Sequence, residues 1–216
     1  MPPPPNFDRV ARLYRWSEYL ALGRLLEHIR FHFLPQLQGC TNALILGDGD
    51  GRFLARLMQQ NPALHATAVD TSATMLHLLR RRCMQSAPAA ATRLSTIHRS
   101  ALEVDAPPHT DLIVTHFLLD CLTQPQVDAF AQRLGEQVQR GCLWVVSDFE
   151  VPRHPLLRPL GAAYIRTLYL AFRVLTGLRV THLPDPQSAL TAAGFSRIER
   201  HERLGGLVYT ELWVQP

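Results

Sequence analysis

The chain has 216 residues, of which 22 are Lys or Arg and 18 are Asp or Glu, so its formal net charge is +4. This length suits one α/β domain whose core needs no disulfide or metal to fold, and the small, dispersed positive charge argues against a nucleic-acid-binding protein. No apolar run approaches a membrane span, and the opening MPPPP lacks the order of a signal peptide. Four cysteines without a C-x-x-C pair indicate a reduced, cytoplasmic setting.

The N-terminal part of the chain predicts helices before a sheet begins. One or two helices are expected within residues 7–20 and 21–33. We expect residues 1–40 to form a proline-rich lead with lid helices. Residues 41–216 are expected to form a single domain.

The segment ALILGDGDGRFLARL, residues 43–57, predicts a buried strand, a glycine-rich turn and a helix. Gly47, Gly49 and Gly51 let the backbone take positive φ and approach a bound molecule. A dinucleotide site would need G-x-G-x-x-G, and no register of this turn supplies the third glycine. The turn therefore predicts a nucleotide-like ligand other than a dinucleotide.

Acidic residues in and after this turn narrow the choice of ligand. Asp48 and Asp50 place negative charge where phosphates would lie, which favours a ligand with a ribose, an adenine and cationic ammonium and sulfonium groups. S-adenosylmethionine has that chemistry. Asp70 ends a second short strand about 20 residues after the glycines, the spacing at which an acid binds both ribose hydroxyls. Ser72 is a candidate N-cap of the next helix.

Strand and helix patterns alternate up to about residue 147, which is typical of a doubly wound parallel sheet. Prolines then break the pattern, a long and a short helix follow, and two late strands joined at Gly205 and Gly206 must pair antiparallel. We expect an α/β, Rossmann-like sheet of seven strands with the last strand antiparallel and the long helix after strand five as a lid. The expected strands are 43–46, 66–69, 95–98, 111–115, 143–147, 196–203 and 207–214, and the expected helices are 53–60, 72–85, 124–140 (ended by Gly141), 157–176 and 186–193.

From about Phe7 to the C-terminus, these residues resemble the class I S-adenosylmethionine-dependent methyltransferase superfamily. In outline the chain is similar to the ubiquinone/menaquinone methyltransferase group and its small-molecule relatives, on the stretches FDRVARLY, DLIVTHFLLDCL and AGFSRIERHERLGGLVYTELW. The resemblance implies a seven-stranded sheet that binds S-adenosylmethionine at the carboxyl ends of the first strands. S-adenosylhomocysteine would be the product.

The resemblance also implies roles for individual residues. The implied cofactor contacts are Tyr14 on the N-terminal helix, Gly47, Asp48, Gly49 and Gly51 at the methionine part, Asp70 at the ribose, Thr71, Met75, Ser100 and Ala101 around the adenine, and His116 and Phe117 at the methyl-transfer face. Two positions depart from the family pattern: Ile45 stands where an acid usually precedes the first glycine, and Ser100 replaces the usual aspartate after strand three. These changes predict weaker cofactor binding, or a role for Asp48 in supplying the missing charge near the ammonium.

Methyl transfer from a sulfonium asks for little acid–base chemistry, because aligning the nucleophile and the methyl group in a dry pocket supplies most of the rate. Residues at the ends of strands four and five are candidates for a catalytic role. His116, at the end of strand four, could take a proton from a phenol, enol or carboxylic acceptor. Asp120 could orient that imidazole, and Glu150 or Asp148 could face the acceptor. The alternative is that these residues have no catalytic role: His116 would only form a hydrogen bond with the backbone, and the acidic side chains would only be solvated.

The expected lid helix has an apolar stripe and a basic stripe. The apolar stripe holds Tyr164, Leu168, Phe172 and Leu175, and the basic stripe holds Arg166 and Arg173. This pattern predicts either a lid for an apolar acceptor, with arginines for a carboxylate or a lipid surface, or an ordinary packed helix. His28 and His32 share a helix face, but no third ligand joins them at helical spacing, so no metal site is expected.

The leading interpretation is an enzyme that methylates a small, apolar or aromatic molecule. A cofactor-binding subunit or sensor without catalysis is an alternative that the changes at Ile45 and Ser100 allow. A nucleic-acid methyltransferase is disfavoured, because THFL at the end of strand four lacks the N/D-P-P-Y/F motif. The missing third glycine disfavours a nicotinamide oxidoreductase.

Overall fold

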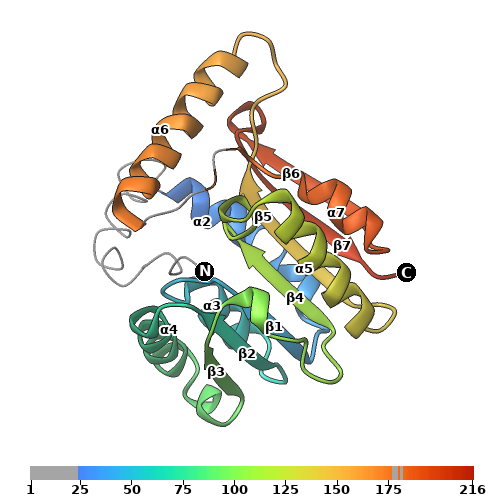
Figure 1. Cartoon of the computed structure of the whole chain (residues 1–216). Helices are drawn as coiled ribbons and strands as arrows, with labels where there is room; N and C mark the ends of the chain where they lie inside the picture. Colours follow the sequence, from blue (N-terminus) through green and yellow to red (C-terminus); the bar gives the residue numbers. More distant parts are fainter. Residues whose placement is uncertain (1–23, 177–179, 181) are drawn as a thin grey trace.

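The structure, a computed structural model, describes residues 24–176, 180 and 182–216. The strands of these residues form one sheet in the order β3-β2-β1-β4-β5-β7-β6 (Figure 1). The strands are β1 (Asn42–Leu46), β2 (His65–Asp70), β3 (Leu94–His98), β4 (Leu112–His116), β5 (Leu143–Phe149), β6 (Ser196–Arg203) and β7 (Val208–Val214). The helices are α2 (Arg24–Phe31), α3 (Arg52–Gln60), α4 (Ala73–Ser86), α5 (Gln124–Gln137), α6 (Arg158–Thr176) and α7 (Pro186–Ala192), with short 3₁₀ turns that include η3 (Ala101–Glu103), η4 (Leu119–Cys121) and η5 (Leu204–Gly206).

The direction of the strands follows from the length of their connections. Strands β1 to β5 pair in parallel, and each crossover holds at least one helical segment. The three-residue turn η5 is too short for a crossover, so β7 pairs antiparallel with β6. On its other side, β7 also pairs antiparallel with β5. The expected fold class is confirmed, with seven strands in the described residues, the last of them antiparallel, and helices on both faces.

Two apolar cores lie on opposite faces of the sheet, because consecutive strand residues point to opposite sides. Leu112 and Val114 of β4 pack with α3 and α4, whereas Ile113 packs with α5 and α7. Trp144 is fully buried on the α5–α7 side, where its ring stands edge-on to Phe130 at 5.9 Å between centroids. This alternation also decides which side of the sheet each polar residue at a strand end can reach.

A third apolar cluster covers the carboxyl ends of β4 and β5. Its buried members are Leu26, Ile29, Phe149 and Val208, and its half-buried members are Leu25, Phe117, Tyr164, Leu168 and Leu183. We call it the α2–α6 cluster, since both helices contribute to it. Helix α2 packs against β6, β7 and α3, while α6 stands out from the end of the sheet in Figure 1.

The observed boundaries differ from the expected ones mainly at α5. The helix ends at Gln137 because Val138 adopts an extended conformation, with φ −98° and ψ 157°. Gly141, expected to end this helix, instead lies in the turn before β5, with φ 87°, and donates its N–H to the Gln215 carbonyl at 2.7 Å. The helix expected within residues 7–20 lies outside the described residues. Over the described ranges, no helix is both long enough and apolar enough to cross a bilayer.

Candidate active site

The glycine-rich turn lies at the carboxyl edge of the sheet, where β1 separates β2 from β4. Ligands of open α/β sheets bind at this switch point. Gly47, Gly49 and Gly51 have φ values of 73°, 57° and 78°. Among the described residues, a Cβ on Gly49 would meet no atom within 4 Å, whereas a Cβ on Gly51 would lie 2.7 Å from the Cα of Leu79. Gly49 therefore leaves an open backbone face for a ligand, and Gly51 allows α3 to pack on α4.

The two acids of the turn interact with the protein itself. The Oδ2 atom of Asp48 accepts a hydrogen bond from the Leu54 N–H at 3.0 Å, in the first turn of α3, where backbone N–H groups lack helical partners. The Oδ2 atom of Asp50 lies 2.8 Å from Arg82 Nη2 and 3.2 Å from Arg52 Nε. The expectation that both carboxylates present negative charge to a ligand is wrong for Asp50, because two guanidinium groups balance its charge.

Burial makes Asp48 a pH-sensitive group, because it raises the pKa of the carboxyl from 3.8 to about 7. Between about pH 4 and pH 7 the folded protein then binds more protons here than the unfolded chain, so this group lowers the free energy of unfolding as pH rises. We expect Asp48→Asn, whose amide oxygen still accepts from Leu54, to be more stable than the parent by roughly 1–3 kcal/mol near pH 8. The difference should vanish near pH 4, as urea denaturation at both pH values would show. A constant difference would contradict the raised pKa.

The end of β2 carries the acid expected at the ribose. The Oδ1 atom of Asp70 accepts from the Ser72 N–H at 2.8 Å, and Ser72 Oγ accepts from the Met75 N–H at 3.2 Å, which confirms Ser72 as the cap of α4. After β3, Ser100 Oγ accepts from the Leu102 N–H at 3.3 Å and caps η3. The roles of Asp70 at the ribose and of Ser100 at the adenine stay predictions.

The other residues expected at the adenine lie around the same edge. Met75 is buried in α4, and Thr71 is exposed, with its carbonyl oxygen 2.9 Å from His98 Nε2. Ala101 is half-buried and packs against the α5–α7 core. Tyr14 lies outside the described residues.

His116 is the last residue of β4 and is buried, with 2% of its surface exposed. Its Nδ1 lies 2.9 Å from Ser147 Oγ, and Ser147 Oγ donates to Thr210 Oγ1 at 2.8 Å. In the tautomer in which Ser147 Oγ donates to Thr210 and accepts from the His116 Nδ1–H, the lone pair of the imidazole lies on Nε2. That buried Nε2 has no hydrogen-bond partner among the described residues.

The environment of His116 keeps its imidazole neutral. Burial lowers the pKa of this histidine well below its usual 6.5, and the positive charge of Arg30 lowers the pKa further. Nε2 is therefore unprotonated at neutral pH and can accept a hydrogen bond or a proton. The alternative of a histidine bonded to backbone does not describe Nδ1, whose partner is a side chain.

Asp120 lies on the opposite side of the sheet from His116. Ser147 and Asp148 are consecutive residues of β5, so they face opposite sides, and Ser147 is on the side of His116. The Asp120 N–H donates to Asp148 Oδ2 at 3.1 Å. The prediction that Asp120 orients the imidazole is therefore wrong, because Ser147 holds Nδ1.

Asp120 and Asp148 form a buried carboxyl pair. Burial raises the pKa of Asp120 to about 6, and burial together with the Asp120 charge raises the pKa of Asp148 well above its usual 3.8. Two such neighbours disfavour the state in which both carboxyl groups are ionised. The Tyr169 hydroxyl of α6 donates to the Asp120 carbonyl oxygen at 2.7 Å. This contact joins α6 to the end of β4.

Glu150 is neutralised by arginines. It pairs with Arg200, and its Oε1 lies 3.3 Å from Arg153 Nη2. Arg200 also binds the buried Glu211, with Nη1 2.8 Å from Oε1. The expectation that Glu150 faces an acceptor is therefore not met, since its carboxylate is used to join β5 to β6.

Arg30 is a residue of the site that the sequence interpretation missed. Its Cζ lies 5.0 Å from the centre of the Phe117 ring, within cation–π distance, and its charge lowers the pKa of both Asp48 and His116. The available signal was an arginine on the apolar stripe of α2, at the i+4 position after the buried Leu26. The structure thus brings a cation from the N-terminal helix to the glycine-rich turn.

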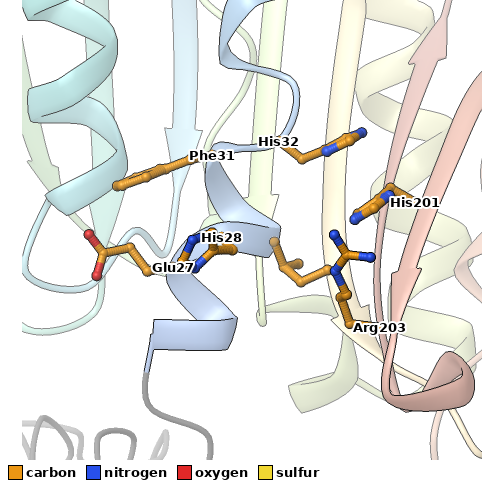
Figure 2. Close-up of a pocket in the computed structure, with 7 residues that line it drawn as sticks. Glu27, His28, Phe31, His32, His201 and Arg203 are labelled. Carbon is orange, nitrogen blue, oxygen red and sulfur yellow. The ribbon is translucent and has the colours of Figure 1, made fainter.

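A cavity of about 660 Å³ lies between α2 and β6, and none of its lining residues belongs to the glycine-rich turn (Figure 2). Figure 2 shows His32 beside His201, and their rings stack at 3.9 Å between centroids. The cavity is lined by Glu27, His28, Ile29, Phe31, His32, His201 and Arg203. His32 therefore packs against another ring, and the described residues contain no group of three or more acids, histidines or cysteines arranged to hold a metal.

Comparison with known proteins identifies the fold and finds a family match over part of the chain. Residues 44–143 match the family model described as a methyltransferase domain. This match covers just under half of the chain and indicates a methyltransferase domain within it. No curated protein matches the sequence.

Solved structures of methyltransferases share this fold at low sequence identity. A putative O-methyltransferase from Nostoc punctiforme has a TM-score of 0.72 at 19% identity, over 96% of this chain and 60% of that one. The S-adenosylmethionine-dependent methyltransferase SibL has a TM-score of 0.66 at 19% identity, over 94% of this chain and 57% of that one. The N-methyltransferase NodS from Bradyrhizobium japonicum, in complex with S-adenosylhomocysteine, has a TM-score of 0.63 at 15% identity, over 88% of each chain.

Proposed function

We propose that the methyltransferase domain acts on a small, apolar or aromatic acceptor that carries an O–H or N–H group. The observation that carries this proposal is the buried, neutral imidazole of His116, whose Nε2 has no partner in the described part of the chain. Phe117 follows it directly, and Phe149 packs on Phe117 at 5.0 Å between ring centroids. The Phe53 ring lies 4.5 Å from the His116 ring. A polar atom next to aromatic rings suits an acceptor with one polar group on an apolar frame.

The residues at the glycine-rich turn fit S-adenosylmethionine. The open backbone face of Gly49 gives room for the methionine part, and Asp70 lies at the end of β2, where it can bind the ribose hydroxyls. The guanidinium of Arg30, near the turn, would hold the cofactor's carboxylate. The bound cofactor supplies an electrophilic methyl group.

His116 would act on the acceptor rather than on the cofactor. Nε2 accepts the hydrogen bond of the acceptor O–H or N–H and receives its proton as the new bond to the methyl carbon forms. Ser147 and Thr210 hold the ring in the tautomer that this step requires. Phe117, Tyr164 and Leu168 of the α2–α6 cluster are half-buried, so they can contact the apolar part of the acceptor and exclude water.

The test is turnover of S-adenosylmethionine labelled in the methyl group, with a panel of phenols, hydroxyquinones, aromatic amines and aliphatic acids. The proposal predicts a methylated product from apolar aromatic acceptors and S-adenosylhomocysteine in equal amount. Cofactor binding without product from any acceptor would instead support the non-catalytic subunit or sensor. A product formed with RNA or DNA but not with small molecules would also contradict the proposal.

A further inference from the structure

Helix α6 and the residues just before it have two unlike faces. The inner face carries Tyr164 and Leu168 into the α2–α6 cluster. The outer face exposes large apolar side chains to solvent, because Leu156, Leu160 and Leu170 are 77%, 69% and 62% exposed. Exposure of three leucine side chains to water on one short segment is energetically unfavourable and indicates a contact surface.

The charged side chains of the segment that contains α6 are all positively charged. Residues 151–184 contain five arginines and no aspartate or glutamate. Arg158, Arg166 and Arg173 are exposed, and within the described residues none of them has an acidic partner within ion-pair distance. We define the outer face of α6 as these three arginines together with Leu156, Leu160 and Leu170. It combines exposed apolar groups with uncompensated positive charge.

The exposed leucines and arginines of this face together favour one kind of partner. In a symmetric dimer built on this face, arginines would meet arginines, so a second copy of the chain is disfavoured. A nucleic acid would balance the arginines but leave the leucines in water. An anionic lipid surface takes both groups, since leucines enter the boundary of the acyl chains while arginines bind the headgroup phosphates.

We propose that the outer face of α6 docks on an anionic lipid surface. The helix, about 28 Å long at 1.5 Å per residue, would lie in the plane of the interface. Its inner face would remain on the α2–α6 cluster, which places the candidate active site next to the lipid surface. The proposal does not depend on the identity of the acceptor, because it rests on residues that face away from the crevice.

The test is co-sedimentation of the full chain with vesicles of phosphatidylglycerol and phosphatidylcholine, and with vesicles of phosphatidylcholine alone. We expect binding to the anionic vesicles that falls strongly at about 0.5 M salt, where charge attraction is screened. The variant Arg158→Gln/Arg166→Gln/Arg173→Gln should bind more than about tenfold more weakly, since each arginine near an anionic surface contributes roughly fivefold. The variant Leu156→Ser/Leu160→Ser/Leu170→Ser should also lose binding.

A matched control removes the same charge elsewhere. The variant Arg80→Gln/Arg81→Gln/Arg140→Gln has the same net charge as the arginine variant of α6, and its three positions are exposed. It should bind vesicles like the parent, and all variants should keep the parent's circular dichroism and its affinity for S-adenosylhomocysteine. Equal loss in the control, no binding by the parent, or light scattering that shows a dimer broken by the leucine changes would overturn the proposal.

Discussion

Gly51→Ala is expected to lower the free energy of unfolding by roughly 2–5 kcal/mol. The left-handed backbone of this residue, with φ 78°, costs a non-glycine residue about 1–2 kcal/mol. The new Cβ would also lie 2.7 Å from the Cα of Leu79, a backbone atom that can move only if α4 shifts from α3. Such overpacking adds about 1–3 kcal/mol. Urea denaturation followed by circular dichroism measures the sum.

Gly49→Ala is the matched control for this change. Its φ of 57° imposes a similar backbone strain, but a Cβ there meets no atom within 4 Å in the part of the chain that the structure describes. We expect a loss of only about 1–2 kcal/mol in stability, with a large loss of affinity for S-adenosylhomocysteine because the methyl group fills the open face. Equal destabilisation by the two substitutions would show that contact between α3 and α4 is not the role of Gly51.

Replacing His116 is expected to have the largest effect on turnover. His116→Ala removes the Nε2 acceptor, and the loss of a positioned base lowers kcat by about 10²- to 10⁴-fold. The affinity for S-adenosylhomocysteine, measured by calorimetry, should change little. His116→Asn keeps a polar side chain in the buried site, so a similar loss of turnover in a variant with the parent's melting temperature would separate chemistry from folding.

Substitutions of Ser147, which positions the His116 imidazole, also test the role of this histidine in turnover. Ser147→Ala removes the partner of His116 Nδ1 but leaves Nε2 in place, so kcat should fall less than in His116→Ala, with KM for the cofactor unchanged. Ser147→Thr keeps a hydroxyl and should restore part of the rate. Parent-like kcat in both His116 variants would assign this histidine to packing against Phe53, whose ring lies 4.5 Å away.

Local patterns were enough to predict the fold. Apolar runs of strand length, a glycine-rich turn after the first of them and the short turn before the last strand each constrain the chain within a few residues. Ser72 could be predicted as a cap because its partner, Met75, is three residues away. The end of α5 was missed, because Val138 leaves the helix without a glycine or proline to mark it.

The partners of the charged residues could not be predicted, since they lie far apart in the sequence. Asp50 pairs with Arg82 across the contact between α3 and α4, and Glu150 pairs with Arg200 across the sheet. The sequence predicts Asp120 to lie beside His116, because only three residues separate them. The chain instead turns at Phe117, with φ 54°, and the carboxyl group of Asp120 lies beside Asp148, which points to the other face of the sheet.

Isothermal titration calorimetry with S-adenosylhomocysteine tests the central claim, that the glycine-rich turn and Asp70 form the cofactor site of a methyltransferase. The parent protein is expected to bind one equivalent, Asp70→Asn to bind more weakly, and Gly49→Ala to give little or no heat while remaining folded. A parent protein that gives no heat with S-adenosylhomocysteine, but binds NAD or a nucleoside triphosphate in a manner that Gly49→Ala abolishes, would contradict the account.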